Sequence, residues 1–84
     1  MTTATISPWP LVRQGDQQHP VQTLQYLLRA RGRNLTVDGI FGPGTDAAVR
    51  GFQQALHLDI PSVTVDGIVG PVTWQALVSG MLSF

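Results

Sequence analysis

The feature of this sequence that most limits its possible folds is an internal repeat with a spacing of 28 residues. Residues 37–45 read Val-Asp-Gly-Ile-Phe-Gly-Pro-Gly-Thr, and residues 65–73 read Val-Asp-Gly-Ile-Val-Gly-Pro-Val-Thr. Aligning 37–53 with 65–81 gives eight identities in seventeen positions, which chance does not produce in a chain of 84 residues. One structural unit is therefore expected to occur twice.

Each copy of the repeat predicts a tight turn followed by a helix. An Asp-Gly pair favours a turn, because Asp bonds backbone amides two residues further on and Gly tolerates a positive φ. Gly42-Pro43 and Gly70-Pro71 then have the composition of an N-cap and a first helical position, where the missing N–H of Pro costs nothing. The repeat therefore serves mainly as scaffold.

The apolar spacing predicts three helices, at about 20–31, 43–57 and 71–78. Gly32 is expected to end the first helix. The residues expected to face inward from the first two helices are Val21, Leu24, Leu27, Leu28, Ala48, Val49, Phe52, Ala55 and Leu56. Short runs at 35–37 and 63–65 allow a minimal two-stranded ribbon. The sequence thus predicts an all-α, compact three-helix domain.

The third helix has a second apolar stripe, formed by Trp74, Val78 and Met81. A helix that is apolar on two faces is either enclosed in the core or offers one face to a partner. We expect the enclosed arrangement, with the segment around Trp9 or the C-terminal tail covering the stripe. The expected organisation is an extended segment at 1–14, a folded domain at 15–80 and an apolar tail at 81–84.

The composition excludes several classes of function. The chain has no Cys, and its five Arg balance five Asp with no Lys or Glu, so it lacks the basic surface of a nucleic-acid binder. No apolar run approaches the ~18 residues of a membrane span. The first residues have neither the basic nor the apolar region of a signal peptide. We expect neither nucleic acid nor membrane as a partner.

The residues also argue against catalysis. Glycoside hydrolysis uses two placed carboxylates, and two of the five Asp residues here belong to the turns. His19 and His57 are the only histidines, and their spacing matches no zinc motif. No serine lies in a nucleophile motif. The chain is therefore expected to be no enzyme and to hold no metal or cofactor.

The combined pattern resembles the three-helix peptidoglycan-binding domain family. The resemblance is carried by Leu24-Gln25, by the doubled Asp-Gly-x-x-Gly-Pro-x-Thr and by Phe52-Gln53, and it covers residues 15–80. Such domains are accessory modules of bacterial and phage wall hydrolases. The resemblance implies non-catalytic binding of peptidoglycan, through its glycan strand or its stem peptide, that tethers an associated activity to the wall. A wall hydrolase or an assembly partner is then expected.

This expectation leaves one alternative and one question of location. The alternative is a protein–protein adaptor in the same fold, for example a component of a phage particle or a secretion assembly. Wall binding implies a location at the cell wall or in the periplasm. The sequence shows no signal peptide, so it does not indicate an export route. A cytoplasmic stage before release is compatible with the sequence.

Binding a glycan–peptide polymer requires a shallow groove with hydrogen-bonding, aromatic and cationic side chains. Arg50 is the strongest of the candidates, although a solvated helix face explains it equally well. For the Asp and Gln candidates, hydrogen bonds to the turns and crossing loops are the structural alternative. The candidate ligand-binding residues are Gln25, Asp38, Ile40, Thr45, Arg50, Gln53, Asp66, Ile68, Thr73 and Trp74.

Overall fold

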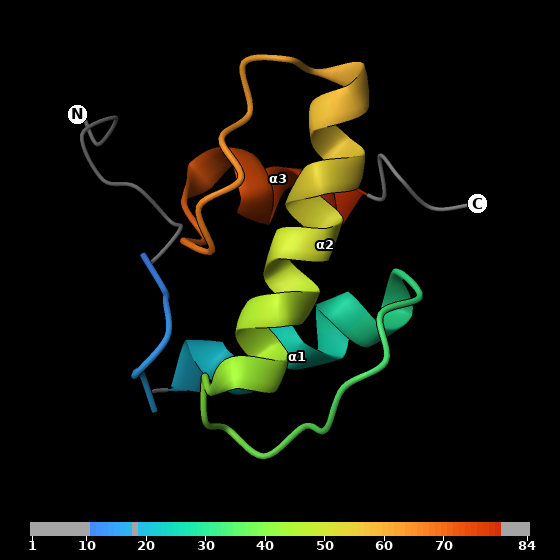
Figure 1. The fold of residues 1–84 in the computed structure, drawn as a ribbon. Coiled ribbons are helices and arrows are strands. Elements are labelled where there is room, and N and C mark those ends of the chain that lie inside the picture. The colour runs from blue at the N-terminus through green and yellow to red at the C-terminus, as the bar shows by residue number, and fades with distance from the viewer. Residues whose placement is uncertain (1–10, 18, 80–84) are drawn as a thin grey trace, which may run out of the picture.

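The computed structural model describes residues 11–17 and 19–79, and it contains three helices within those residues (Figure 1). They are α1 (His19–Ala30), α2 (Pro43–Asp59) and α3 (Pro71–Ser79). The predicted all-α, three-helix fold is confirmed, and the helix bounds lie close to those expected. In Figure 1, α2 runs upright, α1 crosses behind its lower end and α3 crosses behind its upper half.

The ends of α1 and α2 follow from local sequence. After α1, Gly32 has φ +90° and its N–H bonds the carbonyl of Arg29, while the N–H of Arg33 bonds the carbonyl of Leu28. This is a Schellman cap, and it confirms Gly32 as the residue that ends the helix. Gly42 is the N-cap of α2 and Pro43 its first residue, also as predicted. Because glycine has no side chain, the start of α2 has no side-chain capping hydrogen bond.

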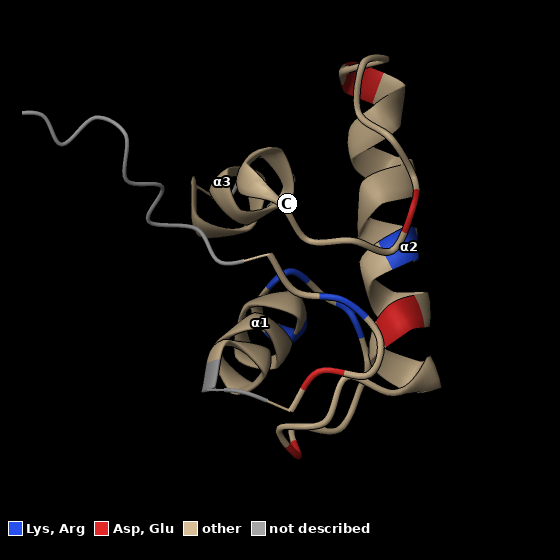
Figure 2. Cartoon of the chain, turned by 90° about the vertical axis from the view of Figure 1, so that its left-hand side faces the viewer, with Lys and Arg blue, Asp and Glu red and all other residues tan. Residues whose placement is uncertain are grey.

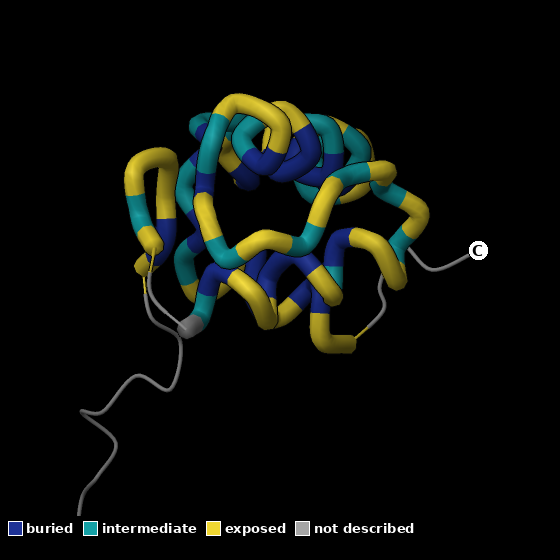
Figure 3. Tube along the Cα trace, turned by 90° about the horizontal axis from the view of Figure 1, so that it is seen from below, coloured by how far each residue is buried: buried dark blue, intermediate teal, exposed yellow. Residues whose placement is uncertain are grey.

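The hydrophobic core lies where α1 packs against α2 and α3. The predicted inward residues of α1 and α2 are buried, except Leu27 and Ala55, which are partly buried against the core. The buried segments of the chain face one another across the centre of the molecule (Figure 3). Arg31 Nε also donates to the carbonyl of Leu77 at 2.9 Å, which joins the C-terminal ends of α1 and α3.

The β-type contacts differ from the prediction. The ribbon that the runs at 35–37 and 63–65 allow does not form, because these segments lie toward opposite ends of α2 (Figure 1). The residues after each turn pair instead with the N-terminal segment. Val12 and Val69 form an antiparallel bridge, and Phe41 exchanges backbone hydrogen bonds with Gly15 and Asp16. One short segment therefore joins both turns.

The third helix is enclosed on part of its surface. Trp74 is buried at 3% exposure, whereas Val78, on the same predicted stripe, is 51% exposed. The other parts of that prediction, namely Met81, the cover around Trp9 and the C-terminal tail, lie outside the described residues.

Charged residues of both signs are spread over the described chain, and acidic and basic positions alternate along α2 (Figure 2). In the part of the chain that the structure describes, no helix has the length and apolar character needed to cross a bilayer.

Candidate functional site

The first turn is held by a buried glutamine on α1. Gln25 Oε1 accepts hydrogen bonds from the backbone N–H groups of Asp38 and Gly39, at 3.1 and 2.9 Å. Its Nε2 donates to Asp38 Oδ1 (3.1 Å), the Ile40 carbonyl (3.0 Å) and Thr45 Oγ1 (2.9 Å). We call this arrangement the first clasp. It fixes the turn against α1 and the start of α2 at the same time.

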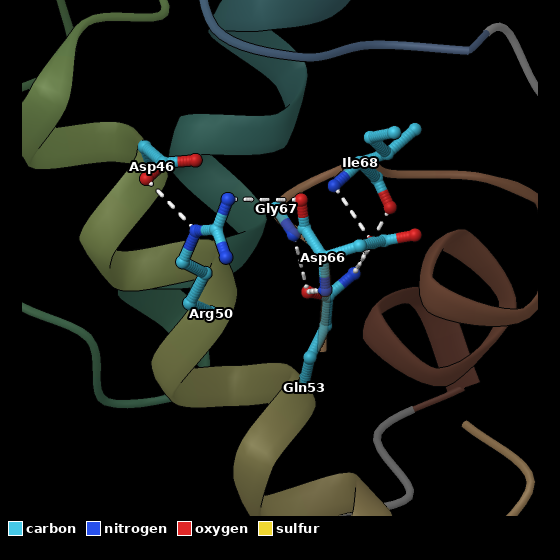
Figure 4. Close-up of polar contacts among 6 residues, drawn as sticks. All are labelled: Asp46, Arg50, Gln53, Asp66, Gly67 and Ile68. Atoms are coloured by element: carbon cyan, nitrogen blue, oxygen red, sulfur yellow. Dashed lines mark hydrogen bonds and ion pairs between the residues drawn. The ribbon is translucent and has the colours of Figure 1, made fainter. Parts of the chain in front are cut away.

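The second turn is held in the same way by Gln53 on α2. Gln53 Oε1 accepts from the N–H groups of Asp66 and Gly67, at 3.1 and 2.9 Å (Figure 4). Its Nε2 donates to Asp66 Oδ1, the Ile68 carbonyl and Thr73 Oγ1 at 3.3, 2.9 and 3.2 Å. Each member of this second clasp stands 28 residues after its counterpart in the first. The two turns are therefore built alike.

Both turns need the special properties of their Asp-Gly pair. Gly39 and Gly67 have φ +78° and +76°, in the left-handed region that favours glycine. Asp38 Oδ1 accepts from the N–H of Ile40 at 3.0 Å, and Asp66 Oδ1 accepts from that of Ile68 at 2.9 Å. These contacts confirm the predicted bonding of both carboxylates to turn amides.

The hydrogen bonds of Asp38 also affect its ionisation. The N–H of Ile40 and, next, the side-chain amide of Gln25 hold the pKa of this carboxyl below its ordinary value of 3.8. Desolvation opposes them without reversing the direction. The turn therefore favours an ionised Asp38.

The second turn carries an ion pair. Arg50 Nε lies 3.0 Å from Asp46 Oδ2, and Arg50 Nη2 donates to the carbonyl of Asp66 at 3.0 Å (Figure 4). The pair covers Gly67, where an added Cβ would overlap Asp46 Oδ1. At the first turn, the neighbour of Gly39 is the uncharged Gln22, 3.4 Å from such a Cβ. Half of the Arg50 side chain remains exposed, so it can still meet an anion.

A crevice opens beside each turn. The first crevice has a volume of about 460 Å³ and is lined by residues 34–36, 38, 40 and 42–45. The second crevice has a volume of about 220 Å³ and is lined by residues 62–64, 66, 68 and 70–73, together with Gln53. Adding 28 to each residue number of the first crevice gives a residue of the second. The repeat thus places one crevice on each turn-helix unit.

The structure divides the ten candidate residues into an inner and an outer group. The inner group is buried, and it comprises Gln25, Thr45, Gln53, Thr73 and Trp74. The outer group reaches solvent, and it comprises Asp38, Ile40, Arg50, Asp66 and Ile68. Asp38, Ile40 and Thr45 line the first crevice, and Gln53, Asp66, Ile68 and Thr73 line the second. Neither crevice is lined by Arg50 or by the buried Trp74.

Sequence reasoning missed six residues that line the first crevice, namely Asn34, Leu35, Thr36, Gly42, Pro43 and Gly44. The repeat gave a signal for three of them, since Thr36, Gly42 and Pro43 recur unchanged 28 residues later. The other three differ from their counterparts, so the repeat did not mark them. Among the described residues, no cluster of three His, Cys, Asp or Glu side chains lies close enough to hold a metal ion. What the described site offers is hydrogen bonding, an apolar contact and one exposed cation.

The chain is similar to known proteins in both sequence and fold. A sequence model of the family described as a peptidoglycan binding domain matches residues 17–77. The chain is similar to the crystal structure of a Burkholderia AP3 phage endolysin, with TM-score 0.73 and 41% identity, over 84% of this chain and 26% of the endolysin. A comparison with curated proteins gave no match.

Two further solved structures are similar to the chain. One is a peptidoglycan-binding protein from Clostridioides difficile, solved in complex with glutamine hydroxamate: TM-score 0.74, 35% identity, 86% of this chain and 42% of that protein. The other is the SleB N-terminal domain, with TM-score 0.74 and 35% identity, over 84% of this chain and 92% of that domain. The chain thus spans about a quarter of the endolysin and less than half of the Clostridioides protein, but nearly all of the SleB domain.

Proposed function

Because the chain belongs to the peptidoglycan-binding domain family, we propose that it binds bacterial peptidoglycan non-covalently and without catalysing a reaction. The observation that carries the proposal is the match of the family over residues 17–77, which contain both clasps and both crevices. The domain is a binding module, and its shallow, open crevices suit recognition of a polymer surface better than enclosure of a small reactant.

The two groups of candidate residues take different roles in this proposal. The outer residues contact the ligand: the two isoleucines provide apolar contact, the two carboxylates accept hydrogen bonds, and Arg50 attracts an anionic group such as a stem-peptide carboxylate. The inner residues act indirectly. The side chains of Gln25 and Gln53 form their hydrogen bonds with the turns, so they position the crevice walls.

The proposed biological role is to concentrate an associated activity at the wall. This chain resembles about a quarter of a phage endolysin and nearly all of an N-terminal domain. A module of this size beside a second domain raises the local concentration of that domain at the surface it binds. The proposed location of the chain during its function is accordingly the bacterial cell wall.

Co-sedimentation with purified insoluble peptidoglycan tests the proposal. The wild-type chain should pellet with the wall material at low and moderate salt, and Arg50→Ala should pellet less, most clearly at low salt where the attraction of an exposed charge is least screened. The turbidity of the suspension should stay constant, since no bond is cleaved. A wild-type chain that stays in the supernatant would refute wall binding and favour the adaptor alternative.

A further inference from the structure

We propose that the first crevice is the principal ligand site of this chain, that it takes a methyl group next to an amide, and that the second crevice is the same site narrowed by Val72. This inference rests on the proposed binding of peptidoglycan and specifies where and how the ligand is held.

The starting observation is that the two crevices have nearly the same walls. Of the nine lining positions that they share, six hold the same residue type in both: Thr, Asp, Ile, Gly, Pro and Thr. The glutamine clasp behind each crevice also has the same hydrogen bonds. A difference in size between the crevices must therefore come mainly from the three positions that differ.

Only one of those three differences makes the second crevice smaller. Asn34 and Leu35 are replaced by the smaller Ser62 and Val63, which would widen it. Gly44 is replaced by Val72, whose side chain is 56% exposed beside the opening. Nothing lies within 4 Å of a Cβ added at Gly44, so the corresponding space in the first crevice is open. We therefore assign the narrowing of the second crevice to Val72.

The size of the crevices decides between them. The first crevice, at about 460 Å³, has about twice the volume of the second, at about 220 Å³. It therefore has more room for a group that projects from a polymer. The ligand group is therefore held in the larger, first crevice, within residues 34–45.

The lining of the first crevice indicates the chemistry of that group. Ile40 is 49% exposed and offers an apolar contact, while Asn34 and Thr36 are exposed and offer hydrogen-bond donors and acceptors. A methyl group adjoining an amide satisfies both kinds of wall. Peptidoglycan contains this chemistry in the acetamido groups of its amino sugars and in the alanine residues of its stem peptides. The experiment must distinguish these two sources.

Exchange of the distinguishing residue is the test. Gly44→Val gives the first crevice the side chain of the second, and Val72→Gly does the reverse. Ala47→Val is the matched control, because it adds the same side chain to an exposed position of α2 that lines neither crevice. Thermal melts of all variants separate a loss of folding from a loss of binding. Binding is measured by co-sedimentation with insoluble peptidoglycan.

We expect Gly44→Val to weaken binding by about tenfold, equivalent to about 1.4 kcal/mol. Ala47→Val should bind as the wild type does, Val72→Gly at least as tightly, and the double exchange more tightly than Gly44→Val alone. The proposal would be overturned if folded Gly44→Val bound peptidoglycan as tightly as the wild type. It would also be overturned if folded Val72→Gly bound more weakly than the wild type. If the wild type itself does not sediment, the proposed function fails, which is a different outcome.

Competition identifies the source of the recognised group. Peptide-free glycan strands should release the chain from the wall if the acetamido group is bound, and free stem peptide should do so if an alanine residue is bound. If a competitor releases the wild-type chain but no longer releases Gly44→Val, the result supports the first crevice as the ligand site. If it releases Gly44→Val as readily as the wild type, the proposal is overturned.

Discussion

The clasp at the first turn makes a quantitative prediction about stability. Gln25→Met keeps the length of a fully buried side chain but removes all five of its hydrogen-bonding contacts. The change therefore tests the hydrogen bonds rather than the packing. Gln54→Met is the control, because Gln54 is exposed on α2 and lines neither crevice.

The expected cost follows from the contacts. The amide has two N–H groups for its three donated contacts, so the five contacts count as four hydrogen bonds. At about 0.5–1.5 kcal/mol net each, they give roughly 4 kcal/mol. Burial of the Met side chain returns ~2 kcal/mol. The buried Thr45 hydroxyl, which loses its donor, costs about 1 kcal/mol. The net loss is therefore about 3 kcal/mol. A domain of this size has a stability of roughly 4–13 kcal/mol, so the loss is a large share of it.

Thermal and urea unfolding measure this loss. For a small domain 1 kcal/mol corresponds to about 4–8 °C in Tm, so Gln25→Met should melt about 12–24 °C below the wild type. Gln54→Met should stay within about 0.5 kcal/mol of it. If Gln25→Met lost less than about 1 kcal/mol more than Gln54→Met, the clasp would not be what holds the turn.

Two further predictions concern the same turns. Gly67→Ala should destabilise the protein more than Gly39→Ala does. Both changes place a side chain at a positive φ, which costs about 1–2 kcal/mol, but only Gly67→Ala must also displace the Asp46–Arg50 pair. Equal losses of Tm in the two variants would contradict this prediction. Asp38 has a lowered pKa in the folded state, so its contribution to stability is present above about pH 3.8 and is lost as the pH falls through the lower folded-state value. Melts from pH 5 to pH 2 should show the wild type losing stability relative to Asp38→Asn, whose amide does not titrate in this range, and parallel curves would contradict the assignment.

The features that sequence reasoning predicted are local ones. Gly-Pro pairs start α2 and α3, Gly32 ends α1, and the Gly of each Asp-Gly pair takes a positive φ. Each of these features depends on only a few neighbouring residues. The role of the two glutamines was expected only as an alternative to ligand binding. Their spacing of 28 residues is the signal that ties them to the repeated turns.

The features that sequence reasoning missed depend on contacts between distant segments. Val12 lies in a segment with little periodicity, yet it is fully buried and bridges to Val69. The composition of 35–37 and 63–65 allows a ribbon, but the crossing of the helices separates these segments. The difference between the crevices follows from Gly44 and Val72, and its effect on their volume becomes visible only in three dimensions.

The most direct test of the central claim is an NMR titration of the ¹⁵N-labelled 84-residue chain with soluble peptidoglycan fragments that carry both sugars and stem peptides. The account predicts that the largest shifts of backbone amides occur at residues 34–45, with smaller shifts at residues 62–73. Saturating fragments that leave the amides of residues 34–45 unchanged, or that shift only the outer face of α1, would contradict it.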